Sequence, residues 1–111
     1  MVKTPEVHRG DVFLVNLDPT RGQEIRKMRP CLVVSPDELN DNIQTIIVAP
    51  LTKGSHVYPF RVACRFQGKS GHIVLDQIRT VDWERLVRRL GAVSPQALRR
   101  SLMVLQEMFA P

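Results

Sequence analysis

Two neighbouring stretches decide the fold: Arg29-Pro-Cys-Leu-Val-Val-Ser-Pro36 and Thr45-Ile-Ile-Val-Ala-Pro50. Each contains a short, continuous apolar run bounded by turn residues, a pattern typical of a buried β-strand. A similar run, Val12-Phe-Leu-Val-Asn-Leu17, precedes them and is followed by the turn sequence Asp18-Pro-Thr-Arg-Gly22. The sequence therefore predicts three successive strands, the third of them ending at Pro50.

Further strands are expected downstream. Residues 61–66 alternate, with Val62, Cys64 and Phe66 on one face. Residues 72–75 and 78–81 form two more apolar runs in close succession. Many short strands without helical periods between them favour a small antiparallel barrel.

The end of the chain has a different pattern. Ser94 followed by Pro95 is a typical helix start, with an N-cap and a proline in the first turn. From there, apolar residues recur at helical spacing at Leu98, Leu102, Leu105 and Phe109. We therefore expect a mainly β fold with one C-terminal amphipathic helix, in a single domain over residues 1–111.

Composition narrows the function classes. The chain has 111 residues, 43% of them hydrophobic, which favours a folded domain over a disordered polymer. Its formal net charge of +5, carried mostly by arginine, makes a polyanionic partner plausible. Cys31 and Cys64 lie in apolar runs without CxxC spacing, so we interpret them as core residues. Without an apparent signal peptide or membrane span, we expect a cytoplasmic protein.

Familiar catalytic motifs do not stand out. His8, His56 and His72 are far apart and share no motif, and only His56, in a polar loop, is a candidate for ligand contact. The sequence contains no GxSxG, GxxxxGK[ST] or HExxH pattern. We therefore expect no metal site and no cofactor.

The informative residues lie where loops meet strands. Glu24 and three cations precede the strand that begins near Pro30, and this proline favours an extended backbone at Arg29. Thr52 and Lys53 follow the strand that ends near Pro50. Taken alone, these residues are also compatible with a solvated basic loop and an ordinary turn.

Six segments, spread over nearly the whole length, together resemble the MazF/PemK family of bacterial toxins, which are sequence-selective endoribonucleases. They are Arg9-Gly-Asp-Val12, Leu17-Asp-Pro-Thr-Arg-Gly-Gln-Glu24, Arg29-Pro-Cys-Leu-Val-Val-Ser-Pro36, Val48-Ala-Pro-Leu-Thr52, Tyr58-Pro-Phe60 and Leu75-Asp-Gln-Ile-Arg-Thr-Val-Asp82. The resemblance implies an SH3-like barrel and a homodimer. It also implies an antitoxin partner whose acidic tail covers the RNA groove, and metal-independent cleavage of single-stranded RNA to 2′,3′-cyclic phosphate and 5′-hydroxyl ends.

The same resemblance assigns catalytic roles to Arg29, Thr52 and Glu24. Arg29 suits charge stabilisation because its planar guanidinium can bind phosphate oxygens through two hydrogen bonds. Its high pKa makes it a poor proton carrier, so Glu24 is the other candidate base, or else a partner that orients Arg29. Contacts with RNA are predicted for Asp18, Arg21, Ser35, Lys53, His56, Asp76, Gln77 and Arg79.

Other basic and aromatic residues are given structural interpretations. Arg85, Arg88 and Arg89 form a basic cluster that we interpret as surface or dimer-edge charge. Trp83 is interpreted as a partly buried structural residue rather than a base-stacking platform.

Two alternative functions remain open. A toxin of the related CcdB family would bind DNA gyrase without catalysis through the end of its C-terminal helix, but this helix ends in Met-Phe-Ala-Pro, without a polar tip. A passive barrel that binds single-stranded nucleic acid is compatible with the composition.

Overall fold

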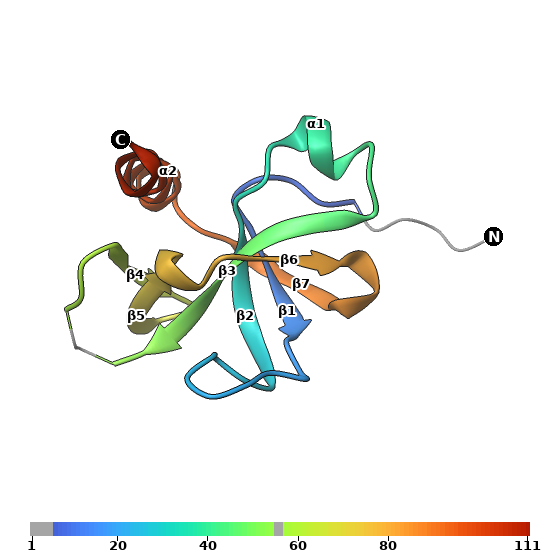
Figure 1. Cartoon of the computed structure of the whole chain (residues 1–111), viewed down its shortest axis with the longest axis horizontal. Helices are drawn as coiled ribbons and strands as arrows, with labels where there is room; N and C mark the ends of the chain where they lie inside the picture. Colours follow the sequence, from blue (N-terminus) through green and yellow to red (C-terminus); the bar gives the residue numbers. More distant parts are fainter. Residues whose placement is uncertain (1–5, 55–56) are drawn as a thin grey trace.

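The computed structural model describes residues 6–54 and 57–111, which form one antiparallel seven-stranded sheet, two α-helices and two short 3-10 helices (Figure 1). The strands are β1 (Asp11–Asn16), β2 (Met28–Val33), β3 (Thr45–Lys53), β4 (Arg61–Phe66), β5 (Lys69–Val74), β6 (Arg79–Asp82) and β7 (Leu86–Ala92). The helices are α1 (Asp37–Asn40), η1 (Leu75–Gln77), η2 (Trp83–Arg85) and α2 (Pro95–Phe109). The mainly β fold with a C-terminal helix is confirmed.

Strand β3 organises the sheet, whose strand order is β4-β5-β3-β2-β1-β7 with β6 also paired to β3. Its first half pairs with β6 as far as Val48, and its last residues, from Leu51, pair with β5. The predicted strand end at Pro50 is therefore wrong. Pro50 is tolerated because it lies in the gap between these two ladders, where a missing N–H costs little.

Strand β7 is an element that the sequence pattern did not reveal. It pairs antiparallel with β1, from Asp11 opposite Ala92 to Val15 opposite Leu86. Arg88 and Arg89 therefore lie within a strand, and their exposed side chains explain the absence of an apolar pattern. Its pairing with β1 is made by backbone hydrogen bonds, which periodicity does not report.

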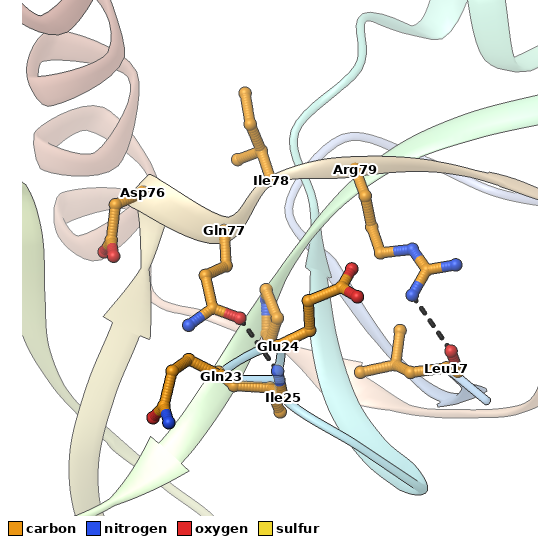
Figure 2. A pocket seen from close by; sticks show the side chains of 9 residues that line it. Leu17, Gln23, Glu24, Ile25, Asp76, Gln77, Ile78 and Arg79 are labelled. Atoms are coloured by element: carbon orange, nitrogen blue, oxygen red, sulfur yellow. Dashed lines mark hydrogen bonds between the residues drawn. The ribbon is translucent and has the colours of Figure 1, made fainter. Parts of the chain in front are cut away.

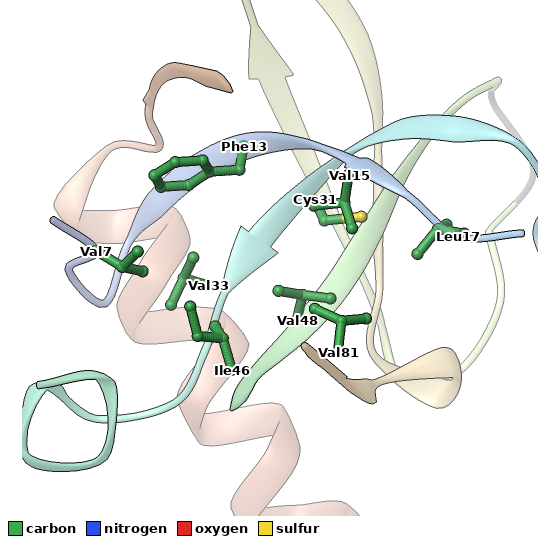
Figure 3. Packing of buried hydrophobic residues seen from close by; sticks show 9 residues of the cluster. All are labelled: Val7, Phe13, Val15, Leu17, Cys31, Val33, Ile46, Val48 and Val81. Carbon is green, nitrogen blue, oxygen red and sulfur yellow. The ribbon is translucent and has the colours of Figure 1, made fainter. Parts of the chain in front are cut away.

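The apolar residues form two clusters. The first lies between β1, β2, β3 and β6 and includes Phe13, Val33 and Ile46 (Figure 3). The second lies beneath α2 and includes Leu32, Ile73 and Leu75. Cys31 belongs to the first cluster and is fully buried, as predicted, whereas Cys64 is half-buried beside the second. Trp83 packs partly buried against the first cluster, which confirms its structural interpretation.

Helix α2 begins as predicted, since the Ser94 side chain accepts a hydrogen bond from the Ala97 N–H at 3.1 Å. Its packing face is rotated from the expected one. Ala97 and Ser101 are buried and Leu105 packs on the second cluster, whereas Phe109 is 70% exposed. The described residues contain no helix with the length and apolarity needed to span a membrane.

Candidate nucleic-acid interface

Strands β2 and β3 bring Arg29 and Thr52 together. The β2–β3 ladder ends with Cys31 opposite Pro50, and Arg29 and Thr52 each lie two residues beyond this pair. Arg29 is also paired with Val15 of β1, and Thr52 with His72 of β5, so each backbone is held from its other side. Both residues line the same two cavities, of about 640 and 140 Å³.

Arg29 presents an exposed guanidinium at this place. The residue is exposed, and none of the described residues forms a hydrogen bond or an ion pair with its side chain. Because it belongs to β2 rather than to a loop, its backbone position is fixed by the strand pairing. A positive, planar donor at a rigid strand position is suited to binding an anionic group.

Thr52 is placed by an unusually close approach of β5. The Cβ of any other residue at Gly71 would lie 2.1 Å from the Thr52 carbonyl oxygen. Gly71 pairs directly with Lys53 in the β3–β5 ladder. The absence of a side chain at position 71 is therefore what allows β5 to hold the backbone around Thr52.

Glu24 reaches the larger cavity from the β1–β2 loop. That cavity is lined by Glu24, Arg29 and Thr52, so the three predicted catalytic residues face one space. The Glu24 carboxylate accepts a hydrogen bond from the Arg21 N–H. In the described part of the chain it forms no ion pair with Arg29, which does not support the orienting role.

The loop that carries Glu24 is fastened to the rest of the site. Gln77 Oε1 accepts a hydrogen bond of 2.9 Å from the Ile25 N–H, and this contact ties the loop to η1 (Figure 2). Asp18 Oδ1 accepts the Lys27 N–H at 3.1 Å within the same loop. Asp18 therefore holds the conformation of the loop, whereas Gln77 lines a neighbouring cavity.

A third cavity, of about 380 Å³, adjoins the larger of these two through Glu24 and is lined by Asp76, Gln77 and Arg79 (Figure 2). The Arg79 guanidinium donates a hydrogen bond to the Leu17 carbonyl at 2.9 Å. The predicted RNA-contact residues of η1 and β6 therefore lie beside the catalytic candidates.

Positive charge surrounds the larger cavity. Arg26, Lys27, Arg29 and Lys53 line it and all four are exposed. Arg21 is exposed in the same loop but lines none of the cavities described for the structure. The groove that the three adjoining cavities form over β2, β3, η1 and the β1–β2 loop is therefore electropositive on its open side.

Besides Asp18 and Arg21, which line none of these cavities, two more predicted contact residues are not placed in this groove. Ser35 is 2% exposed, and its hydroxyl donates to Asn40 Oδ1 at 2.6 Å and accepts the Ile47 N–H at 3.1 Å. These bonds make Ser35 a structural residue of the β2–α1 turn. His56 lies outside the described residues.

An ion pair at the other end of the groove was not anticipated. Arg61, at the start of β4, donates from Nε and Nη2 to the two oxygens of Asp76 at 2.9 and 3.1 Å. This contact lowers the pKa of Asp76 and raises that of Arg61, in both cases chiefly through the hydrogen bond. The strand alternation predicts only that Arg61 points away from the core; no sequence spacing reports its partner.

Cys31, His72 and His8 have no assigned role in the groove. Burial raises the pKa of Cys31 to about 12, so its thiol stays protonated at neutral pH. His72 is 9% exposed in β5, in line with its structural interpretation. His8 is exposed, and its pKa is raised, first by the hydrogen bond to Glu6.

Comparison with known proteins agrees with this fold and identifies a family. The family model described as PemK-like, MazF-like toxin of type II toxin-antitoxin system matches residues 8–109. The endoribonuclease toxin MazF of Escherichia coli strain K12 is 34% identical over 90 residues, covering 80% of this chain and 81% of that protein. The endoribonuclease toxin ChpB of the same strain is 33% identical over 113 residues, covering 96% of this chain and 97% of that protein.

Among solved structures, MazF from Deinococcus radiodurans superposes with a TM-score of 0.81 at 27% identity, covering 96% of this chain and 97% of that one. The family model, which matches residues 8–109, extends from β1 to α2 and includes every strand that lines the groove. The chain therefore belongs to the PemK-like, MazF-like family of type II toxin–antitoxin toxins.

Proposed function

We propose that residues 1–111 form a single toxin domain that cleaves single-stranded RNA sequence-selectively, without a metal or cofactor, and so inhibits translation and growth. The observation that carries this proposal is the single cavity shared by Glu24, Arg29 and Thr52, rimmed by exposed cations. Family membership supports the same activity, because the curated relatives are named endoribonucleases.

The reaction begins with the ribose 2′-hydroxyl attacking the adjoining phosphorus. The 2′-oxygen loses a proton, the bond from phosphorus to the 5′-oxygen breaks, and that oxygen leaves with a proton. The products are a 2′,3′-cyclic phosphate and a 5′-hydroxyl. The pentavalent transition state carries extra negative charge on its phosphate oxygens, so donors held in place beforehand lower its energy.

Arg29 and Thr52 are suited to supply those donors. The guanidinium offers parallel N–H groups and a permanent positive charge, and the threonine hydroxyl offers one further hydrogen bond to the same oxygens. Glu24 is the carboxylate in the same cavity, and we assign to it acceptance of the 2′-hydroxyl proton. Arg29 is assigned charge stabilisation alone, since a guanidinium stays charged and is a poor proton carrier.

The groove also suits a regulatory partner. As a member of a toxin–antitoxin family, the chain is paired with an antitoxin. We propose that an acidic tail of this antitoxin occupies the basic groove in place of RNA, because carboxylates satisfy the same cations as phosphates. We further propose that the toxin acts as a homodimer in the cytoplasm, with two copies of the groove related by twofold symmetry.

The decisive test is incubation of the purified protein with a long RNA of mixed sequence in excess chelator. We expect cuts at a short recurring sequence, and mapping of the new 5′ ends should find hydroxyl groups. Intact RNA together with stalled DNA gyrase would instead indicate a CcdB-like toxin. RNA that is bound but never cut would indicate a passive binding barrel.

RNA binding should weaken as salt rises. Each phosphate that a cation neutralises contributes about −0.7 to the slope of log affinity against log salt for single strands. If the four cations that line the larger cavity all engage phosphates, we expect a slope of about −3. Fluorescence anisotropy with an RNA blocked at the cut site would measure it, and an affinity independent of ionic strength would contradict the proposed groove.

A further inference from the structure

One end of the groove contains an aromatic ring that the proposed cleavage chemistry does not use. A fourth cavity, of about 330 Å³, is lined by Thr52, Lys53, Tyr58, Arg61 and Gln77, among other residues. Because Thr52 also lines the largest cavity, which holds the candidate catalytic residues, the two spaces adjoin at this residue. A nucleotide in the fourth cavity would therefore neighbour the scissile phosphate.

The ring of Tyr58 and the guanidinium of Arg61 form a stack in this cavity. The Arg61 Cζ atom lies 4.6 Å from the centre of the Tyr58 ring, within the range of a cation–π contact. Tyr58 is nevertheless 51% exposed, so much of its surface remains accessible.

Arg61 is fixed in this orientation rather than free to seek a phosphate. Its Nε and Nη2 atoms are bound to the two carboxylate oxygens of Asp76, and its side chain is 23% exposed. Asp76 belongs to η1, whose last residue, Gln77, is in turn bonded to the Ile25 N–H. Element η1 therefore holds Arg61 in the stack and also binds the β1–β2 loop, which carries the candidate base Glu24.

A flat, half-exposed ring backed by a planar cation matches the chemistry of a nucleobase. Bases of single-stranded RNA stack on aromatic rings and on guanidinium planes, and both surfaces are present here at one place. A phosphate would gain less, because the charge of Arg61 is already neutralised by Asp76.

We propose that Tyr58 and Arg61 form a base-stacking subsite that holds a nucleotide next to the scissile phosphate on the Thr52 side of the groove. This inference rests on the proposed ribonuclease function and adds to it a binding site for a nucleobase. Tyr58 contacts the base, Arg61 extends the stack, and Asp76 is a positioning residue that holds Arg61.

The test measures binding rather than cleavage. An RNA carrying the sequence cut by the wild-type protein, with a 2′-deoxy nucleotide at the scissile position, binds but lacks the attacking hydroxyl. We expect Tyr58→Leu to bind this RNA about tenfold more weakly, the usual loss when one base loses its aromatic partner, and Tyr58→Phe to bind it like wild type. Because no charge is removed, the salt slope should be unchanged in both variants.

The matched control is Phe60→Leu, since Phe60 is a nearby aromatic residue, 41% exposed, that does not line the cavity. A series of RNAs with one abasic position each then locates the nucleotide. At one position next to the cut, Tyr58→Leu and wild type should bind equally, because no base remains to stack.

Three results would overturn the subsite: wild-type affinity in Tyr58→Leu, an equal loss in Phe60→Leu, or a loss that no abasic position removes. Each of these leaves the ribonuclease assignment standing. If the wild-type protein neither cuts nor binds RNA, the proposed function itself fails, and the subsite fails with it.

Discussion

Replacement of Arg29 by alanine is expected to reduce RNA cleavage by at least about a hundredfold, since removal of one preorganised transition-state donor usually costs this much. The reason lies in its position. Strand pairing to β1 fixes the backbone of Arg29 beside Thr52, and no other described residue binds its guanidinium. The loss should appear in kcat under single-turnover conditions, because charge develops on the phosphate only in the transition state.

Three further variants separate catalysis from net charge. Arg29→Lys keeps the charge but loses the planar donor, so we expect it to recover only a small part of the activity. Arg88→Ala removes one positive charge from β7, at an exposed residue that lines none of the described cavities, and should cut RNA like wild type. Thr52→Val, which removes one neutral donor, should lose less than Arg29→Ala. Near wild-type cleavage by Arg29→Ala would exclude this residue from the mechanism.

Replacement of Gly71 by alanine is expected to destabilise the fold by about 3 kcal/mol and to impair cleavage by the protein that remains folded. The added methyl group would lie 2.1 Å from the Thr52 carbonyl oxygen. Since this neighbour is backbone rather than a flexible side chain, β3 and β5 must move apart to relieve the clash. The displacement falls on the residue that supplies a candidate donor to the phosphate.

Urea unfolding would measure the loss of stability as a lower midpoint at an unchanged m-value. Ser70→Ala is the matched control for stability alone, because Ser70 is an exposed residue of the same strand but also lines the smaller cavity beside Arg29 and Thr52. Single-turnover cleavage by Gly71→Ala and by the wild-type protein, at a temperature where both are folded, would then test the displacement of Thr52. A Gly71→Ala protein as stable and active as wild type would show that β5 tolerates the extra atom, and would contradict the tight β3–β5 contact.

Much of the fold could be predicted because its core strands are continuously apolar. Residues 12–17, 31–34 and 45–49 are buried on both faces of the sheet or nearly so, and such runs are readable from sequence. Strand β7 could not be predicted, because its pairing partner β1 lies at the other end of the chain and its arginines are exposed. Pro50 led to a wrong prediction of the strand end. Local propensity marks a proline as a strand break, but it cannot show that β3 continues past Pro50 and pairs there with β5 in place of β6.

The candidate site was predictable to the extent that its residues belong to family motifs. Arg29, Thr52 and Glu24 do, and they line one cavity. Ser35 belongs to such a motif as well, yet its hydroxyl forms hydrogen bonds with Asn40 and the Ile47 N–H and is buried in the β2–α1 turn. The partnership of Arg61 with Asp76 depends on the distance between β4 and η1, a tertiary relation that no local spacing reports.

The pairing of β1 with β7 also bears on the order of synthesis. β1 emerges from the ribosome early. The backbone groups along one of its edges have no strand partner until β7 has been synthesised and has left the exit tunnel. The backbone of Arg29 depends on β1, because Val15 is its partner there. A chain that ends before β7 leaves one edge of β1 unpaired, so we expect the strand that pairs with Arg29 to reach its full stability only after β7 has been added.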